Sequence, residues 1–171
     1  ANFPLANGKP YWYTNGIKYE YNDYAGAQAA ANTTLATPAA DVDVSAAYKI
    51  EWEGNNLTVT AQAKLYDNLI GNYYMGVYII EDKAKGTQSG HPQSSPDLEH
   101  HLVMRGSLGG GVWGDEIIAG TADAGAVIEK SYTKAIPSTY VKDNLSVGVI
   151  IWRKNGTKYF YKQAATNQKA H

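Results

Sequence analysis

The feature that most constrains the fold is a strict alternation of apolar and polar residues in two neighbouring segments. The segments 41–52, DVDVSAAYKIEW, and 57–65, LTVTAQAKL, each carry an apolar residue at every second position. A period of two places the apolar side chains on one face of a β-strand and the polar ones on the other. The residues between them, EGNN at 53–56, are typical of a turn. The sequence therefore predicts an antiparallel hairpin with one face in the core.

Further strands follow along the chain, and no sustained helical period appears after residue 40. The segment 73–82, YYMGVYIIED, is apolar on both faces, which predicts a central strand. Asn155-Gly156 separates two strand-like segments and predicts a second hairpin with a type I′ turn. The other predicted strands are 100–108, 126–136, 145–154 and 157–165.

These patterns predict an all-β fold, namely an antiparallel β-sandwich of the jelly-roll or Ig-like type. A chain of 171 residues fits one domain, 1–171, with an irregular lead-in at 1–40 and strands over 41–165. Within the lead-in, the alanine-rich segment 23–36 favours a short helix. The predicted core consists of Val44, Ile50, Trp52, Val59, Leu65, Val77, Ile79, Leu102, Val147, Val149 and Ile151.

Composition narrows the classes of function. The net charge of −1 gives no basic surface for nucleic acid. Cysteine is absent, which excludes disulfides, thiolate metal sites and a cysteine nucleophile. No apolar run approaches the roughly 18 residues that a membrane-spanning helix needs. The 14 tyrosines and 4 tryptophans, against 2 phenylalanines, favour half-buried strands and surfaces.

The segment 99–116, EHHLVMRGSLGGGVWGDE, begins with two adjacent histidines. His100 and His101 are neighbours on a predicted strand, so their side chains point to opposite faces. A zinc site needs three or four ligands. The conceivable set is His91, Glu99 and one of the adjacent histidines. Because that pair cannot converge on one ion without a bulge, we expect no metal site, and we expect no cofactor.

The glycine run of the same segment, GGGVWG at 109–114, matches the G-x-G-x-x-G pattern of dinucleotide-binding loops. That fingerprint requires a helix after the glycines. The residues that follow, DEIIAGTADAGA at 115–126, contain two more glycines and do not favour a helix. We therefore predict a turn or bulge in which Gly109 and Gly111 supply a positive φ.

Paired carboxylates and clustered aromatic residues are the remaining candidates. Glu81-Asp82 and Asp115-Glu116 are adjacent acids, but a glycosidase needs two carboxylates across a cleft, so we expect solvated strand ends. Trp12 and Tyr13 belong to an aromatic-rich lead-in, and Trp113 follows the glycines. Their rings suit stacking on a sugar or anchoring a protein partner, and they suit packing on the sandwich equally.

Arg105 is predicted to have a structural role. Strand alternation puts His101 and Arg105 on one face, and Leu102 and Met104 on the other as a core pair. A guanidinium beside a glycine-rich exit suits a carboxylate or the free carbonyls of a turn. We predict that Arg105 pins the glycine turn in this way and so presents Trp113. The candidate partners are Glu81, Asp82, Asp115 and Glu116.

Three stretches of the sequence occur in an order that is typical of one family. Phe3-Pro4 and Pro38-Ala39 precede the alternating strand, and Ile80-Glu81-Asp82 is followed by a polar loop. The run HHLVMRG at 100–106 then leads to Trp113-Gly114-Asp115. With these motifs the chain resembles the C-terminal domain of the outer-membrane-protein-twenty-eight-related family, which consists of bacterial cell-envelope lipoproteins.

The resemblance implies a location in the bacterial cell envelope, as an outer-membrane, periplasmic or surface-exposed domain. It also implies a thioredoxin-like domain and a lipidated N-terminus upstream, so any anchor is expected in a segment outside this chain. We expect a non-enzymatic β-sandwich module for adhesion or partner binding. The alternative is a carbohydrate-binding module that uses exposed Trp and Tyr. The expected partner is a protein or a glycan of unknown identity, with no nucleic acid and no membrane span.

Overall fold

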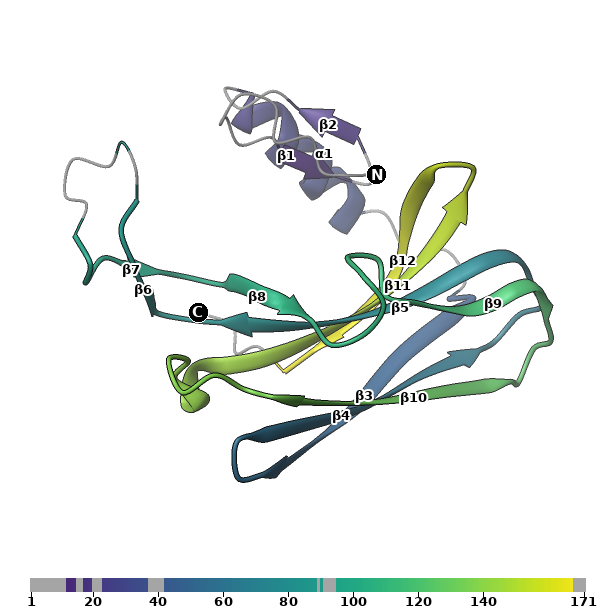
Figure 1. Ribbon diagram of the computed structural model, residues 1–171. Helices are drawn as coiled ribbons and strands as arrows, with labels where there is room; N and C mark the ends of the chain where they lie inside the picture. The colour runs from purple at the N-terminus through teal and green to yellow at the C-terminus, as the bar shows by residue number, and fades with distance from the viewer. Residues whose placement is uncertain are drawn as a thin grey trace.

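The structure, a computed structural model, consists of two antiparallel sheets that pack face to face (Figure 1). The predicted all-β class and the β-sandwich are confirmed. None of the helices in the described part of the chain has the length and hydropathy to cross a membrane. The structure describes residues 12–14, 17–19, 23–36, 42–88, 90 and 95–167.

The smaller sheet contains the alternating segments of the sequence. Its strand order is β10 (Val127–Ala135), β4 (Asn56–Leu65) and β3 (Val44–Glu53). β3 and β4 form the predicted hairpin, which turns through Gly54 and Asn55. Every second residue of β4 is buried, as the period of two requires.

The larger sheet is built around the long central strand β5 (Leu69–Glu81). β11 (Leu145–Asn155) pairs with one edge of β5, and β12 (Lys158–Thr166) pairs with β11. The other edge of β5 is shared, because β9 (Asp115–Ala122) pairs with its first half and β8 (Val103–Ser107) with its second. The central position of β5 confirms the prediction for 73–82, whereas β9 is a strand that the sequence analysis missed.

An arm extends from the sandwich beyond β8 (Figure 1). Its base is a short ladder between β6 (Ala84–Lys85) and β7 (Glu99–His100). A single turn of 3-10 helix over Lys142–Asn144 directly precedes β11. The segment 100–108, predicted as one strand, is therefore divided between two strands, because His101 and Leu102 form a bend between β7 and β8.

The lead-in contains regular elements. β1 (Trp12–Thr14) and β2 (Ile17–Tyr19) form an antiparallel pair. The predicted short helix is confirmed as α1 (Tyr24–Ala36). Asp23 caps its N-terminus, where the Gly26 N–H donates to Asp23 Oδ1 at 3.0 Å.

The second hairpin is confirmed, but its turn type is not the predicted one. Asn155 still pairs with Lys158, so the two central residues of the turn are Gly156 and Thr157. Gly156 has a φ of +58°, and positive φ does not occur at Asn155 or Thr157. A glycine at the first central position alone is the signature of a type II′ turn rather than type I′.

The core lies between the two sheets, and it contains most of the predicted set. Ile50 and Trp52 are only partly buried and pack against its border. The predicted core positions of Leu102 and Met104 are wrong, since these side chains are 45% and 59% exposed. Leu102 has a φ of +57°, which ends the alternation on which the prediction rested. The confirmed core residues are Val44, Val59, Leu65, Val77, Ile79, Val147, Val149 and Ile151.

Candidate binding site at the β8 end of the sandwich

A β-bulge in the edge strand β8 places Arg105. Ile79 of β5 pairs with Gly106, but the next residue, Ile80, pairs with Met104, so Arg105 is an extra residue in the ladder. Bulges re-aim a side chain and bend the strand, and they are frequent next to functional sites. Gly106 has a φ of +141°, which glycine tolerates without strain. The bulge is therefore built into the local sequence, and it lets Arg105 turn toward the end of β5.

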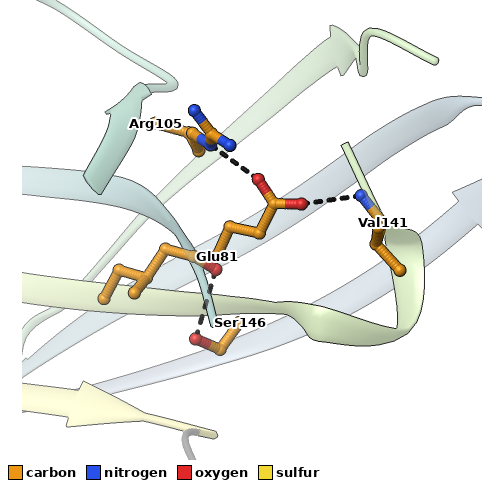
Figure 2. Close-up of polar contacts among 5 residues, drawn as sticks. Glu81, Arg105, Val141 and Ser146 are labelled. Carbon is orange, nitrogen blue, oxygen red and sulfur yellow. Dashed lines mark hydrogen bonds and ion pairs between the residues drawn. The ribbon is translucent and has the colours of Figure 1, made fainter. Parts of the chain in front are cut away.

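At the end of β5, Arg105 forms an ion pair with Glu81, the last residue of that strand (Figure 2). Arg105 Nε donates to Glu81 Oε2 at 2.6 Å, and the Val141 N–H donates to Glu81 Oε1 at 2.7 Å. Glu81 is only 1% exposed, so both oxygens of a buried carboxylate are held by fixed donors. The prediction that Arg105 pairs with a nearby carboxylate is confirmed, and of the candidate partners it is Glu81. The expectation that Glu81 is a solvated strand end is wrong.

Tyr140 holds the guanidinium from one side. The Arg105 Cζ atom lies 4.7 Å from the centroid of the Tyr140 ring, within the range of a cation–π interaction. Arg105 is thus fixed along its Nε edge and on one face. Within the described residues, no acceptor takes a hydrogen bond from its two terminal NH₂ groups.

A pocket of about 280 Å³ opens beside Arg105, between the arm and the loop that precedes β11. Lys85 forms an exposed ion pair with Asp97 at 3.3 Å, a geometry that contributes little energy. Lys83 and Glu99 have no ion-pair partner among the residues that the structure describes. The pocket is lined by Glu81, Lys83, Lys85, Glu99, Arg105, Thr139, Val141 and Asn144.

The two adjacent histidines lie near this end but turn to different partners. His100 Nε2 contacts the Gly86 carbonyl oxygen at 3.0 Å, and His101 Nδ1 contacts Asp82 Oδ1 at 2.7 Å. Over the described ranges, no group of three or more His, Cys, Asp or Glu side chains is arranged to hold a metal ion. His91, the third histidine of the conceivable set, lies outside those ranges.

The glycine run folds the chain back over β5. Gly114 has a φ of +82° and lies so close to β5 that a Cβ would collide with the Met75 carbonyl. Gly111 also has a positive φ, of +63°, but open space surrounds it. The prediction of a positive-φ turn is thus confirmed for Gly111, whereas Gly109 keeps an ordinary φ. Gly109 is instead required by space, because a Cβ there would meet the side chains of Tyr132 and Asp115.

Asp115 holds this turn. Its Oδ1 atom accepts a hydrogen bond from the Gly110 N–H at 3.1 Å. Arg105 is engaged with Glu81 and Tyr140 instead, so the prediction that Arg105 pins the turn and presents Trp113 is wrong. The physical reason is the bulge, which aims the arginine away from the glycine run.

Trp113 closes an aromatic cluster on the outer face of the larger sheet. Its ring stacks on Tyr159, with centroids 4.5 Å apart and planes 3° apart, and it meets Trp152 edge-on at 5.0 Å. Trp152 Nε1 donates to Tyr78 Oη at 3.1 Å, and Tyr78 Oη donates to the Val112 carbonyl at 2.7 Å. Burial raises the pKa of Tyr78, so its phenol stays protonated as the bridge between strand and loop.

Trp113, Tyr159 and Trp152 do not form a flat sugar platform. Trp113 and Tyr159 cover each other face to face, and Trp152 stands at 86° to Trp113. A sugar platform needs exposed rings side by side in one plane. Trp12 and Tyr13 lie in β1, but their side chains are outside what the structure describes.

Sequence reasoning missed three participants of the pocket site. Tyr140, Val141 and Lys83 lie in loops whose approach to Arg105 depends on tertiary structure. The available signal was Glu81 itself, an acidic residue at the end of a strand that is otherwise apolar on both faces. A carboxylate that is buried in such a position is almost always paired.

No protein-family model and no curated protein matches the sequence. Among solved structures, a domain of the outer membrane lipoprotein Omp28 from Porphyromonas gingivalis matches with a TM-score of 0.50 and 18% identity. HBP35 of Porphyromonas gingivalis matches with a TM-score of 0.60 and 12% identity. The chain has the fold of these domains. The resemblance to the Omp28-related family is thereby confirmed at the level of the fold.

The two matches differ in extent. The Omp28 match covers 76% of this chain and 90% of the Omp28 domain. The HBP35 match covers 82% of this chain and 46% of HBP35, so the chain corresponds to about half of that protein.

Proposed function

We propose that this chain is a non-enzymatic domain of a bacterial cell-envelope protein, at the outer membrane or cell surface, and that it binds a protein partner through the Arg105 pocket. One observation carries the proposal. A buried carboxylate, Glu81, fixes through its Oε2 atom an arginine that lines an open pocket. The fold shared with a domain of an outer membrane lipoprotein supports the location in the envelope.

Stability alone gives a weak reason for such a pair. The cost of desolvating two buried charges offsets their attraction, and apolar residues of similar volume often stabilise a fold equally well. The Glu81–Arg105 pair instead supplies orientation, since it sets the plane and direction of a guanidinium at the surface. Arginine is among the residues that most often dominate the energy of protein interfaces.

Exposed apolar residues near Arg105 support a protein partner. Leu102 directly precedes β8, Met104 lies within it, and Val141, which is 53% exposed, lines the pocket. Leu102 is also held at a positive φ, a strained conformation that clusters at functional sites. Large exposed apolar side chains beside a polar pocket are typical of binding surfaces.

The carbohydrate-binding alternative draws no support from the cluster of Trp113, Trp152 and Tyr159, because these rings are stacked or perpendicular rather than side by side in one plane.

The experiment is capture from envelope fractions of the bacterium that produces the protein. The biotinylated chain is compared with Lys83→Glu/Lys85→Glu, which reverses two exposed charges at the pocket, and with Lys130→Glu on β10 as a control. We expect a protein that the chain and the control retain and the double variant loses. Equal capture by all three refutes the pocket as the binding site. Binding to a glycan array that Tyr159→Ala removes supports the carbohydrate alternative instead.

A further inference from the structure

We propose that the Arg105 pocket recognises a carboxylate group, supplied by the partner polypeptide as an acidic side chain or a chain end. This inference rests on the proposed function and names the chemistry that the site takes. It starts from the donors of Arg105 that remain unused within the described chain. A guanidinium presents its N–H groups in a rigid plane, and two parallel hydrogen bonds from that plane match the two oxygens of a carboxylate.

The surroundings of Arg105 prepare it for this contact. Glu81 engages the Nε edge at 2.6 Å and Tyr140 covers one face at 4.7 Å, so the side chain is held before a ligand arrives. Holding a long side chain in place beforehand removes part of the entropy cost of binding. The terminal nitrogens make no hydrogen bond within the described chain, and Arg105 lines the same pocket as Lys83 and Lys85.

The charge of the pocket favours a singly charged anion. Glu81 neutralises most of the charge of Arg105, and Asp97 forms an ion pair with Lys85 that partly neutralises the lysine. Lys83 then supplies the remaining attraction, while Glu99 opposes it from the arm. A carboxylate fits this balance, whereas a phosphate with nearly two negative charges meets two glutamates in the lining.

The size of the pocket favours a small part of a polypeptide. Its volume of about 280 Å³ lies just below the range of pockets that enclose drug-sized ligands. One acidic side chain or one chain terminus fits within such a space together with part of its neighbouring residue. Val141, exposed on the wall, provides apolar contact for the methylene groups that precede a carboxylate.

The test is an NMR titration of the ¹⁵N-labelled chain with short peptides. One peptide carries a central glutamate and blocked ends; a second carries glutamine there and a free C-terminal carboxylate; a third carries glutamine and blocked ends. Glucuronic acid and inorganic phosphate serve as the other probes. We expect saturable shifts at Lys83, Arg105 and Val141 with one of the first two peptides and none with the third. Which of the two binds identifies the source of the carboxylate.

Three variants sharpen the result without removing Arg105, because its loss disturbs the fold. Lys83→Gln is expected to weaken binding about threefold, as an exposed charge contact does. Glu99→Gln is expected to tighten it by a similar factor, and Lys130→Gln on β10 leaves it unchanged. Absence of shifts with either carboxylate peptide at about 20 mM, where even millimolar affinity saturates the site, overturns the inference. So does tighter binding of phosphate or glucuronic acid, or an unchanged affinity in Lys83→Gln.

The two proposals fail separately. If the carboxylate peptides do not bind but Lys83→Glu/Lys85→Glu still abolishes capture of the partner, the binding site stands and its assigned ligand chemistry is wrong. If the peptides bind and capture does not depend on the pocket, the carboxylate site is real and the proposed function is wrong.

Discussion

Replacing Arg105 by alanine tests whether the ion pair at the end of β5 holds this part of the fold. The substitution leaves the Glu81 carboxylate buried, with the Val141 N–H as its remaining donor. A buried carboxylate that loses its cation is strongly destabilising, because the remaining contacts no longer offset the free-energy cost of removing the carboxylate from water. The same substitution removes the contact of the guanidinium with Tyr140.

The size of the effect follows from the exposure of the two partners. Breaking a fully buried pair costs about 3–5 kcal/mol. The Glu81 side chain is 2% exposed but that of Arg105 is 27% exposed, so water screens part of the interaction. We expect Arg105→Ala to lower the free energy of unfolding by roughly 2–3 kcal/mol. For a chain of this length that corresponds to a fall in Tm of about 5–10 °C.

Urea unfolding followed by tryptophan fluorescence measures this change, and Arg153→Ala is the matched control. Arg153 lies exposed on β11 and donates to the Ile70 carbonyl at 3.4 Å, so its removal is expected to cost well under 1 kcal/mol. In a double-mutant cycle, Glu81→Gln and Arg105→Ala should couple by about 1–2 kcal/mol. A loss in Arg105→Ala no larger than that in Arg153→Ala, or a coupling near zero, refutes the reasoning.

Three further predictions concern the glycine turn and the aromatic residues. Gly114→Ala should cost about 3 kcal/mol or more in urea unfolding because its Cβ collides with backbone, while Gly111→Ala, at a positive φ in open space, should cost about 1 kcal/mol. Burial, with the nearby Asp115 charge, raises the pKa of Tyr132 above 10 in the folded chain. The phenol then ionises at a lower pH in the unfolded chain than in the folded one, so the free energy of unfolding has its full value below pH 10 and falls above it. Tyr132→Phe should therefore lose less stability than the parent above pH 10. Trp113→Ala should cost about 3 kcal/mol in thermal unfolding, whereas Tyr161→Ala, half exposed, should stay within about 0.5 kcal/mol.

The parts of the fold that the sequence predicts are those in which one periodicity persists. β3 and β4 alternate without interruption, so their pairing and buried faces follow from the residues alone. β5 is apolar on both faces and is central, as expected. β9 was missed because Gly120 and Thr121 interrupt its apolar pattern, and it is recognisable only from its pairing with β5.

The candidate site escaped prediction where the periodicity breaks. The positive φ of Leu102 and the bulge at Arg105 each shift the alternation, so the face assigned to Leu102 and Met104 was wrong. A one-residue shift moves every following side chain to the opposite face. The sequence narrowed the partner of Arg105 to four acids but did not single out Glu81, and the burial of Glu81 depends on the loop around Val141.

The bulge that aims Arg105 also decides how a partner can approach this edge. In the described chain β8 pairs with β5 alone, which leaves its outer edge available for another strand. Short length, a bulge and a nearby lysine are the devices by which proteins protect such an edge. β8 has all three: five residues, the extra residue Arg105, and Lys134 Nζ donating to the Ser107 carbonyl at 3.3 Å. An added strand would need the regular ladder that the bulge removes, so the proposed recognition would use side chains, and Arg105 is the side chain that Glu81 and Tyr140 hold in place at this edge.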